Sequence, residues 1–174
     1  GQGLISQYEW KKRWRTTYLF ATDRPGFLQK IFDLNAQDQY NDPGRPVMTS
    51  TPSGDRVAVQ DGDYIYLRGS GSSPEGDRPF IDRFNLRNGQ VRRLFQCDRG
   101  VYETFISFYG QNKSEIITSF ESPTTPPNYY LVNLKTKKRT ALTSFPDPAP
   151  QLTAAKRQLV KYKRNDGVEL SGFL

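Results

Sequence analysis

Two stretches of the chain share one pattern of residues, FNLRNGQVRRL at residues 84–94 and VNLKTKKRTAL at residues 132–142. Each places Asn-Leu before a polar turn of four residues, and each then continues into a run that ends in Leu. The two patterns lie 48 residues apart, from Leu86 to Leu134. A repeat of about 40 to 50 residues built from short strands is typical of the blades of a β-propeller.

The segments around this repeat are short apolar or alternating runs bounded by Gly, Pro, Asn and Asp, and they predict strands. Each of two predicted blades has four strands, at residues 56–60, 64–68, 80–86 and 91–97 in one and at residues 104–109, 115–120, 129–134 and 139–145 in the other. An earlier unit shows only its last two strands, at residues 16–21 and 29–34. Because two repeats are a small sample, a β-sandwich remains an alternative.

The sequence therefore predicts an all-β fold, a partial β-propeller of about two and a half four-stranded antiparallel blades. Propellers typically close with four or more blades, so we expect the chain to be a piece of a larger propeller. Open blades leave sheet edges unpaired and an apolar face uncovered. This predicts that the chain produced alone associates with itself through those edges.

Three places also allow a helical interpretation. Residues 30–39 fit a short helix as well as a strand, and residues 149–158 allow about one helical turn. The aromatic residues Trp10, Trp14 and Tyr18 recur at intervals of four residues, which fits one face of a helix. Core packing is the default role for these three side chains.

The composition excludes several kinds of site. The 174 residues include no histidine, so neither Ser-His-Asp nor Cys-His catalysis can occur within the chain. The single cysteine, Cys97, cannot form an internal disulfide. Four aspartates are scattered without the spacing of a calcium loop and are predicted to cap turns: Asp33, Asp38, Asp42 and Asp55. We therefore expect no metal and no cofactor.

The chain is basic, with 25 Lys and Arg against 18 Asp and Glu, a net charge of +7. The basic residues gather at residues 11–15, 135–139 and 156–164. Nucleic-acid binding is one interpretation, but a solvated turn and a half-exposed strand explain the second and third clusters. We expect no nucleic-acid partner. Since no run of 18 apolar residues occurs, we expect no membrane-spanning segment either.

The pattern changes after Phe145, where PDPAP at residues 146–150 forms a stiff, extended break. Further on, Asp166-Gly167 stands between two alternating runs and predicts a hairpin. The chain stops within the second of these runs, at Leu174. We therefore expect residues 1–148 to be a propeller segment and residues 149–174 to be a linker with the first hairpin of a second domain.

Five segments carry a resemblance to a known family. YKRNDGVELSGFL at residues 162–174 resembles the join between propeller and catalytic domain in the prolyl oligopeptidase family of serine peptidases, which includes dipeptidyl aminopeptidases and acylaminoacyl peptidases. Four others resemble its glutamyl endopeptidase-like branch: YNDPGRP at 40–46, GSSPEGDRPF at 71–80, ESPTTPPNY at 121–129 and LTSFPDP at 142–148. The order and spacing of these segments make the resemblance specific. It covers nearly the whole chain.

This resemblance implies that a propeller caps an α/β-hydrolase domain, with the active site in the cavity between them. The hydrolase domain supplies a serine on a Gly-x-Ser-x-Gly turn together with Asp and His. None of these is present here, and the nearest string, GSGSS at residues 69–73, lacks the closing Gly. The resemblance thus implies a peptidase parent that hydrolyses short peptides, and a segment with no catalytic residue that gates the cavity and helps to bind the peptide substrate.

Four residues are candidates for that binding role. Arg13 and Arg15 have the bidentate geometry that suits an acidic substrate side chain. Glu75 and Arg78 either project toward the cavity or, with Asp77, pair with one another at the surface. The alternative is a stand-alone propeller module for protein–protein binding. The compartment is not fixed by the sequence, although bacterial family members are often exported, which favours the periplasm or export over the cytoplasm.

Overall fold

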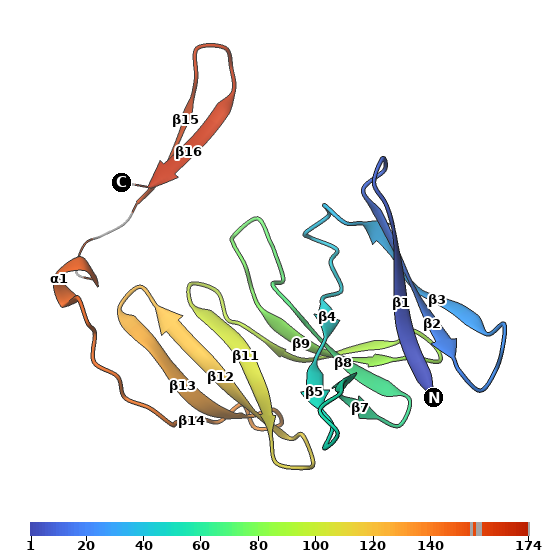
Figure 1. Ribbon diagram of the computed structural model, residues 1–174. Coiled ribbons are helices and arrows are strands. Elements are labelled where there is room, and N and C mark those ends of the chain that lie inside the picture. Colours follow the sequence, from blue (N-terminus) through green and yellow to red (C-terminus); the bar gives the residue numbers. More distant parts are fainter. Residues whose placement is uncertain (154, 156–157, 174) are drawn as a thin grey trace.

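The computed structural model describes residues 1–153, 155 and 158–173. Ala154, Lys156, Arg157 and Leu174 lie outside the described residues, and with them the start of the predicted basic cluster and the predicted break at Leu174. Within the described part, the strands form sheets of three, five, four, two and two strands, all of them antiparallel. The prediction of an all-β partial propeller is confirmed (Figure 1).

The three larger sheets follow one another along the chain, and we call them the first, second and third blade. The first blade has the order β1 (Gln2–Glu9), β2 (Trp14–Ala21), β3 (Leu28–Asn35). The second blade has the order β10 (Val91–Gln96), β9 (Phe80–Asn85), β8 (Tyr64–Gly69), and then β4 (Arg45–Pro46) and β7 (Gln60–Asp61), which both pair with β8. The third blade has the order β11 (Tyr102–Tyr109), β12 (Glu115–Ser122), β13 (Thr125–Asn133), β14 (Arg139–Ala141).

The remaining elements are short. A two-stranded ribbon joins β5 (Met48–Ser50) to β6 (Arg56–Ala58), and a helix of one turn, α1, covers Pro150–Thr153. The predicted hairpin at Asp166-Gly167 is present as β15 (Leu159–Lys163) and β16 (Glu169–Phe173), and Gly167 has a φ of 86° in its turn. This hairpin stands apart from the blades in Figure 1. The division into domains at residue 148 stays a prediction.

Three predictions about local structure are wrong. The first blade has a further strand, β1, because eight residues from Gln2 to Glu9 pair with β2. Trp14 and Tyr18 lie on β2, so they do not share a helix face with Trp10, and the predicted core packing is wrong for Trp10 and Trp14, which are exposed. Residues 56–58 turn back onto β5 instead of forming the inner strand of the second blade, because the tight turn that Thr51 and Asp55 close draws them there.

The second blade is buried on both sides because it lies between the other two. Successive strand residues point to opposite faces of a sheet, and β8 follows this rule. Tyr66 packs with side chains of the third blade, whereas Ile65 and Leu67 pack with the first blade. This double burial explains the continuous apolar run of β8, which a strand with one solvated face would not need.

Large apolar side chains remain exposed on the flanking blades, among them Ile5 on β1, Ile106 and Tyr109 on β11, and Tyr129 on β13. Exposed apolar side chains on open blades favour association. The predicted self-association stays a prediction. Within the described residues, no helix has the length and apolar character needed to cross a membrane.

Candidate functional site

One side of the blades carries a set of connections that we call the loop face. In antiparallel sheets every second connection lies on the same side. The loop face comprises residues 10–13, 36–44, 70–79, 97–101 and 123–124, and it is the upper side in Figure 1. The four predicted binding residues lie in these connections or next to them, because Arg15 is the second residue of β2 and the other three are loop residues.

An ion pair joins the first blade to the loop-face segment that leads into β4. The Arg15 Nη2 atom lies 3.4 Å from Asp42 Oδ1, and the same oxygen accepts the backbone N–H of Gly44 at 3.0 Å. Both side chains are about a third exposed or less. Arg15 thus holds Asp42 in place, and it does not project freely from the surface.

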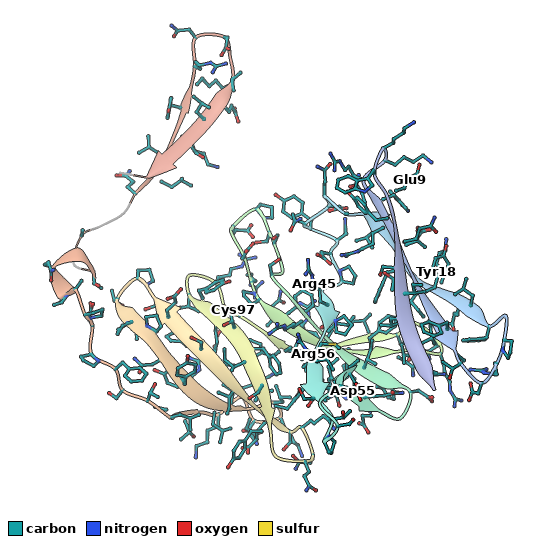
Figure 2. The ribbon with its side chains drawn as sticks, in the orientation of Figure 1. Glu9, Tyr18, Arg45, Asp55, Arg56 and Cys97 are labelled. Carbon is teal, nitrogen blue, oxygen red and sulfur yellow. The ribbon has the colours of Figure 1, made fainter. Side chains whose placement is uncertain are left out.

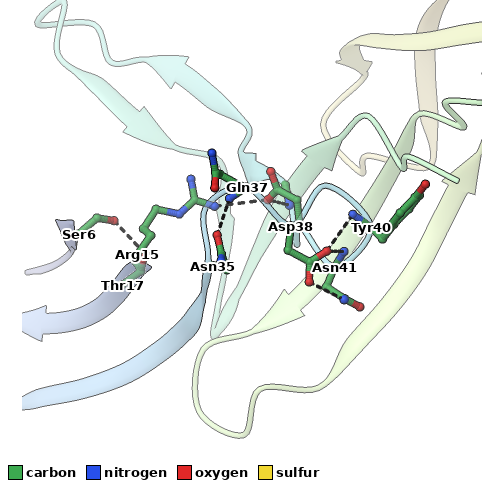
Figure 3. A network of polar contacts seen from close by, with 10 residues as sticks. Ser6, Arg15, Thr17, Asn35, Gln37, Asp38, Tyr40 and Asn41 are labelled. Atoms are coloured by element: carbon green, nitrogen blue, oxygen red, sulfur yellow. Dashed lines mark hydrogen bonds and ion pairs between the residues drawn. The ribbon is translucent and has the colours of Figure 1, made fainter. Parts of the chain in front are cut away.

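The same segment is folded by its own polar side chains (Figure 3). Asp38 accepts the backbone N–H groups of Tyr40 and Asn41, each at 3.2 Å, and the Asn41 amide at 2.7 Å. The bonds from Asn41 lower the pKa of the Asp38 carboxyl below its ordinary value. Asn35 accepts the backbone N–H of Gln37 at 2.9 Å. These turns confirm the predicted capping roles of Asp38 and Asp42, whereas the predicted turn role of Asp33 is wrong, because Asp33 lies within β3.

Two adjoining cavities open on the loop face and share Asp42 and Phe80. The first, which we call the Arg78 cavity, has a volume of about 320 Å³. It lies between the segment at residues 40–43 and the connection from β8 to β9. The second, the Arg45 cavity, has a volume of about 410 Å³ and lies between the second and third blades.

The two arginines that line the Arg78 cavity differ in whether a carboxylate neutralises their charge. Arg93 forms a bidentate pair with the buried Asp82, with Nε–Oδ1 at 2.5 Å and Nη2–Oδ2 at 3.2 Å, and its guanidinium lies 4.2 Å from the Phe80 ring centroid. Arg78 donates its Nε–H to the Cys97 carbonyl at 3.0 Å, a contact with no formal negative charge. In the described part of the chain, Arg78 has no carboxylate partner within ion-pair distance.

The structure places the predicted residues differently from one another. Arg78 lines the Arg78 cavity. Asp42, which forms an ion pair with Arg15, lines the same cavity. Arg13 adopts a φ of 54° in the β1–β2 turn, with its guanidinium 5.2 Å from the Trp10 ring centroid. Glu75 lies in the β8–β9 connection and accepts a hydrogen bond from Ser73 at 3.2 Å, and it lines neither cavity.

Sequence reasoning missed Arg45 and Arg68, which both line the Arg45 cavity. Asp42 was predicted only as a turn residue, although it lines both cavities. The sequence YNDPGRP contained an indication, because Gly44 directly precedes Arg45. Gly44 has a φ of 84°, a left-handed conformation that favours glycine. The predicted pairing of Asp77 with Arg78 is absent among the described contacts, since Asp77 accepts from Ser72 at 2.8 Å.

The loop face carries groups that can bind a ligand. The chain contains no histidine that could activate a serine, and Cys97 is fully buried, which raises the pKa of its thiol. No group of three or more His, Cys, Asp or Glu residues is placed to hold a metal ion in the part of the chain that the structure describes. The arginines and hydroxyl groups of the loop face can hold a ligand.

The chain matches no protein-family model. Among curated proteins, it is 33% identical to a probable chloroplastic glutamyl endopeptidase of Oryza sativa subsp. japonica, over 98% of this chain and 20% of the relative. It is also 33% identical to a probable chloroplastic glutamyl endopeptidase of Arabidopsis thaliana, with the same coverage of both chains. The chain spans about a fifth of the length of these relatives.

Two solved structures are similar at a lower level. One is a variant of the AtxE2 isopeptidase with Astexin3-dC4 bound, at 10% identity and a TM-score of 0.49 over 99% of this chain and 24% of that one. The other is a prolyl endopeptidase, at 15% identity and a TM-score of 0.39 over 99% of this chain and 30% of that one. On its sequence match, the chain is similar over nearly its whole length to probable glutamyl endopeptidases, and it corresponds to about a fifth of such a protein.

Proposed function

We propose that the chain is the non-catalytic propeller segment of a serine peptidase of the prolyl oligopeptidase family. We also propose that its loop face restricts access to the active site and helps to bind the peptide substrate. The observation that carries the proposal is the 33% identity over 98% of this chain to peptidases of which it spans a fifth. Because the chain has no histidine, the catalytic triad belongs to another part of the parent protein, an α/β-hydrolase domain.

Arg78 is the best-placed residue for the substrate-binding role. Arg78 lines a cavity on the loop face, and the hydrogen bond that its guanidinium donates to the Cys97 carbonyl orients it without neutralising its charge. Arg15 acts through Asp42, which it holds at the wall of the same cavity. Arg13 and Glu75 belong to the same face and would meet a substrate only at its rim.

The reading frame of the parent gene gives the first test. We expect it to continue beyond Leu174 for roughly 200 residues and to encode Gly-x-Ser-x-Gly, then Asp, then His. A stop codon directly after Leu174 would instead favour the alternative, a stand-alone propeller module that binds other proteins. The purified 174-residue chain is expected to leave a peptide ester intact, whereas the parent hydrolyses it and loses this activity when the serine of the motif is replaced.

The role of the loop face needs a second test, in the parent protein. Arg78→Gln is expected to raise KM for peptides several-fold while leaving the hydrolysis of a small acyl ester unchanged, because the ester does not reach the propeller. Arg92→Gln is the matched control, since Arg92 is exposed on β10 and lines neither cavity. Equal KM values for Arg78→Gln and the unmodified parent would overturn the proposed binding role.

A further inference from the structure

Two arginines of the second blade lie directly opposite each other. Arg45 on β4 and Arg68 on β8 are partners in the antiparallel register of these strands. Like charges in this position destabilise a sheet, unless something of opposite charge lies between them. Among the residues that the structure describes, neither guanidinium has a carboxylate within ion-pair distance or a hydrogen bond to an acceptor.

The close approach that opposes the two arginines depends on the glycine before Arg45. Gly44 has a φ of 84°, and a Cβ atom there would lie 2.4 Å from the carbonyl oxygen of Arg68. Beyond the pair, Val47 donates its backbone N–H to the Tyr66 carbonyl at 2.8 Å and continues the contact with β8. The backbone therefore fixes the opposition of Arg45 and Arg68, which is not an accident of flexible side chains.

Both arginines line the Arg45 cavity, of about 410 Å³, at the junction of two blades. Figure 2 shows Arg45 on β4, near the middle of the molecule. From the third blade, Tyr102 and Thr104, which both carry a hydroxyl group, also line the cavity. The cavity thus combines two positive charges with neutral hydrogen-bond donors, a donor set that suits an anion.

One negative charge, Asp42, also lines the cavity. Its Oδ1 atom already accepts from Arg15 at 3.4 Å and from the Gly44 N–H at 3.0 Å. Arg15 therefore balances Asp42 from outside the cavity, and the charges of Arg45 and Arg68 remain uncompensated within it. The net charge of the wall is positive.

We propose that the Arg45 cavity binds a carboxylate group of a peptide, with Arg45 and Arg68 on either side of it and with Tyr102 and Thr104 as further donors. A guanidinium matches the two oxygens of a carboxylate through paired hydrogen bonds. A carboxylate bound between them attracts the guanidinium groups of both Arg45 and Arg68 and offsets the repulsion between the two arginines. The carboxylate comes from an acidic side chain or from the C-terminus of the peptide. That the ligand is a peptide rests on the proposed function.

Three N-acetylated pentapeptides test the proposal in titrations of the 174-residue chain. The first contains one Glu and has an amidated C-terminus, the second has only Ala and a free C-terminal carboxylate, and the third has only Ala and an amidated C-terminus. We expect one or both of the first two to bind, and the third to bind at least about tenfold more weakly. Preference between the first two identifies the source of the carboxylate.

Arg45→Gln and Arg68→Gln are each expected to weaken the binding of the carboxylate peptide about five- to tenfold, and Arg92→Gln is the matched control that leaves it unchanged. Without ligand, the two variants are expected to unfold at the same temperature as the unmodified chain or at a higher one, since each removes a like-charge contact. This measurement separates loss of binding from loss of folding.

The proposal is overturned if no pentapeptide binds at millimolar concentration, if the neutral peptide binds equally well, or if both variants retain full affinity. These outcomes do not depend on the reading frame beyond Leu174. If the parent lacks the serine motif but the carboxylate peptides bind as expected, the proposed function fails and the carboxylate site stands. If the parent is a peptidase and no peptide binds to the 174-residue chain, the carboxylate site fails and the proposed function stands.

Discussion

Arg139, on the outer strand β14, pairs with the carboxylate of Glu103, on β11 at the opposite edge of the third blade. Glu103 is only 1% exposed, and it also accepts a hydrogen bond from Thr118 on β12 at 2.7 Å. The Arg139 guanidinium lies 4.7 Å from the ring centroid of Phe120. The Glu103–Arg139 pair ties together β11 and β14, two strands of this sheet that share no backbone hydrogen bonds.

The Glu103–Arg139 pair gives a prediction for stability. Arg139→Gln is expected to lower the free energy of unfolding by about 1 to 3 kcal/mol, because it leaves a buried carboxylate without its charged partner. Adding Glu103→Gln should restore part of the loss, since the buried charge is then gone. Urea unfolding measures both effects, with Lys138→Gln as the exposed neighbouring control. A single variant as stable as the unmodified chain would contradict the prediction.

Asp33 gives a prediction for the effect of pH. Hydrogen bonds from Lys30, Trp14 and Thr16 lower the pKa of its carboxyl from 3.8 to about 2. A depressed pKa contributes stability that is present above the unfolded pKa and is lost as the pH falls toward the folded one. The chain should therefore lose more stability between pH 4 and pH 2 than Asp33→Asn does, as measured by unfolding at each pH. Parallel curves for the two chains would contradict this, and Asp98→Asn is the surface control.

Gly44 gives a prediction that links stability to binding. Gly44→Ala places a Cβ atom against the Arg68 carbonyl and also forces alanine into a left-handed conformation, which costs about 1 to 2 kcal/mol by itself. Gly54→Ala carries the conformational cost alone, since a Cβ there meets no atom within 4 Å. We expect Gly44→Ala to be the less stable variant in thermal unfolding and also to bind the carboxylate peptides more weakly. Equal effects of the two substitutions would show that the close approach is not needed.

Cys97 gives a prediction for reactivity. Its side chain is fully buried, and burial raises the pKa of the thiol, so little thiolate is present near neutral pH. The sulfur also accepts the backbone N–H of Glu103 at 3.1 Å. A disulfide reagent at pH 8 is expected to react slowly with the native chain and rapidly in denaturant. A fast reaction under native conditions would indicate that this connection opens readily.

The repeat could be predicted from the sequence because its local chemistry is visible there. In both copies an Asn side chain folds the turn: Asn85 accepts from the Arg87 N–H at 2.8 Å, and Asn133 accepts from the Lys135 N–H at 3.1 Å. At equivalent places, Gly89 and Lys137 adopt φ values of 72° and 61°. Short-range turns of this kind depend on neighbouring residues alone, so pattern reasoning finds them.

The remaining features depend on partners that are distant in the chain. β4 contains two residues, one of them proline, and it is a strand only because β8 lies beside it. β1 has weak alternation and gains its structure from pairing with β2. The opposition of Arg45 and Arg68 follows from such a pairing, which is why neither residue stood out in the sequence.

The width of the Arg45 cavity is set in the apolar core. One wall belongs to the second blade and the other to the third, and the two blades are joined through Tyr66, Ile81, Phe105 and Ile116. Phe105 belongs to both this core and the cavity wall. Because packed interiors transmit small changes of volume, one methyl group gained or lost near Phe105 would move Tyr102 and Thr104 relative to the arginines. Ligand preference could thus drift during evolution through buried substitutions alone, with every charged residue unchanged.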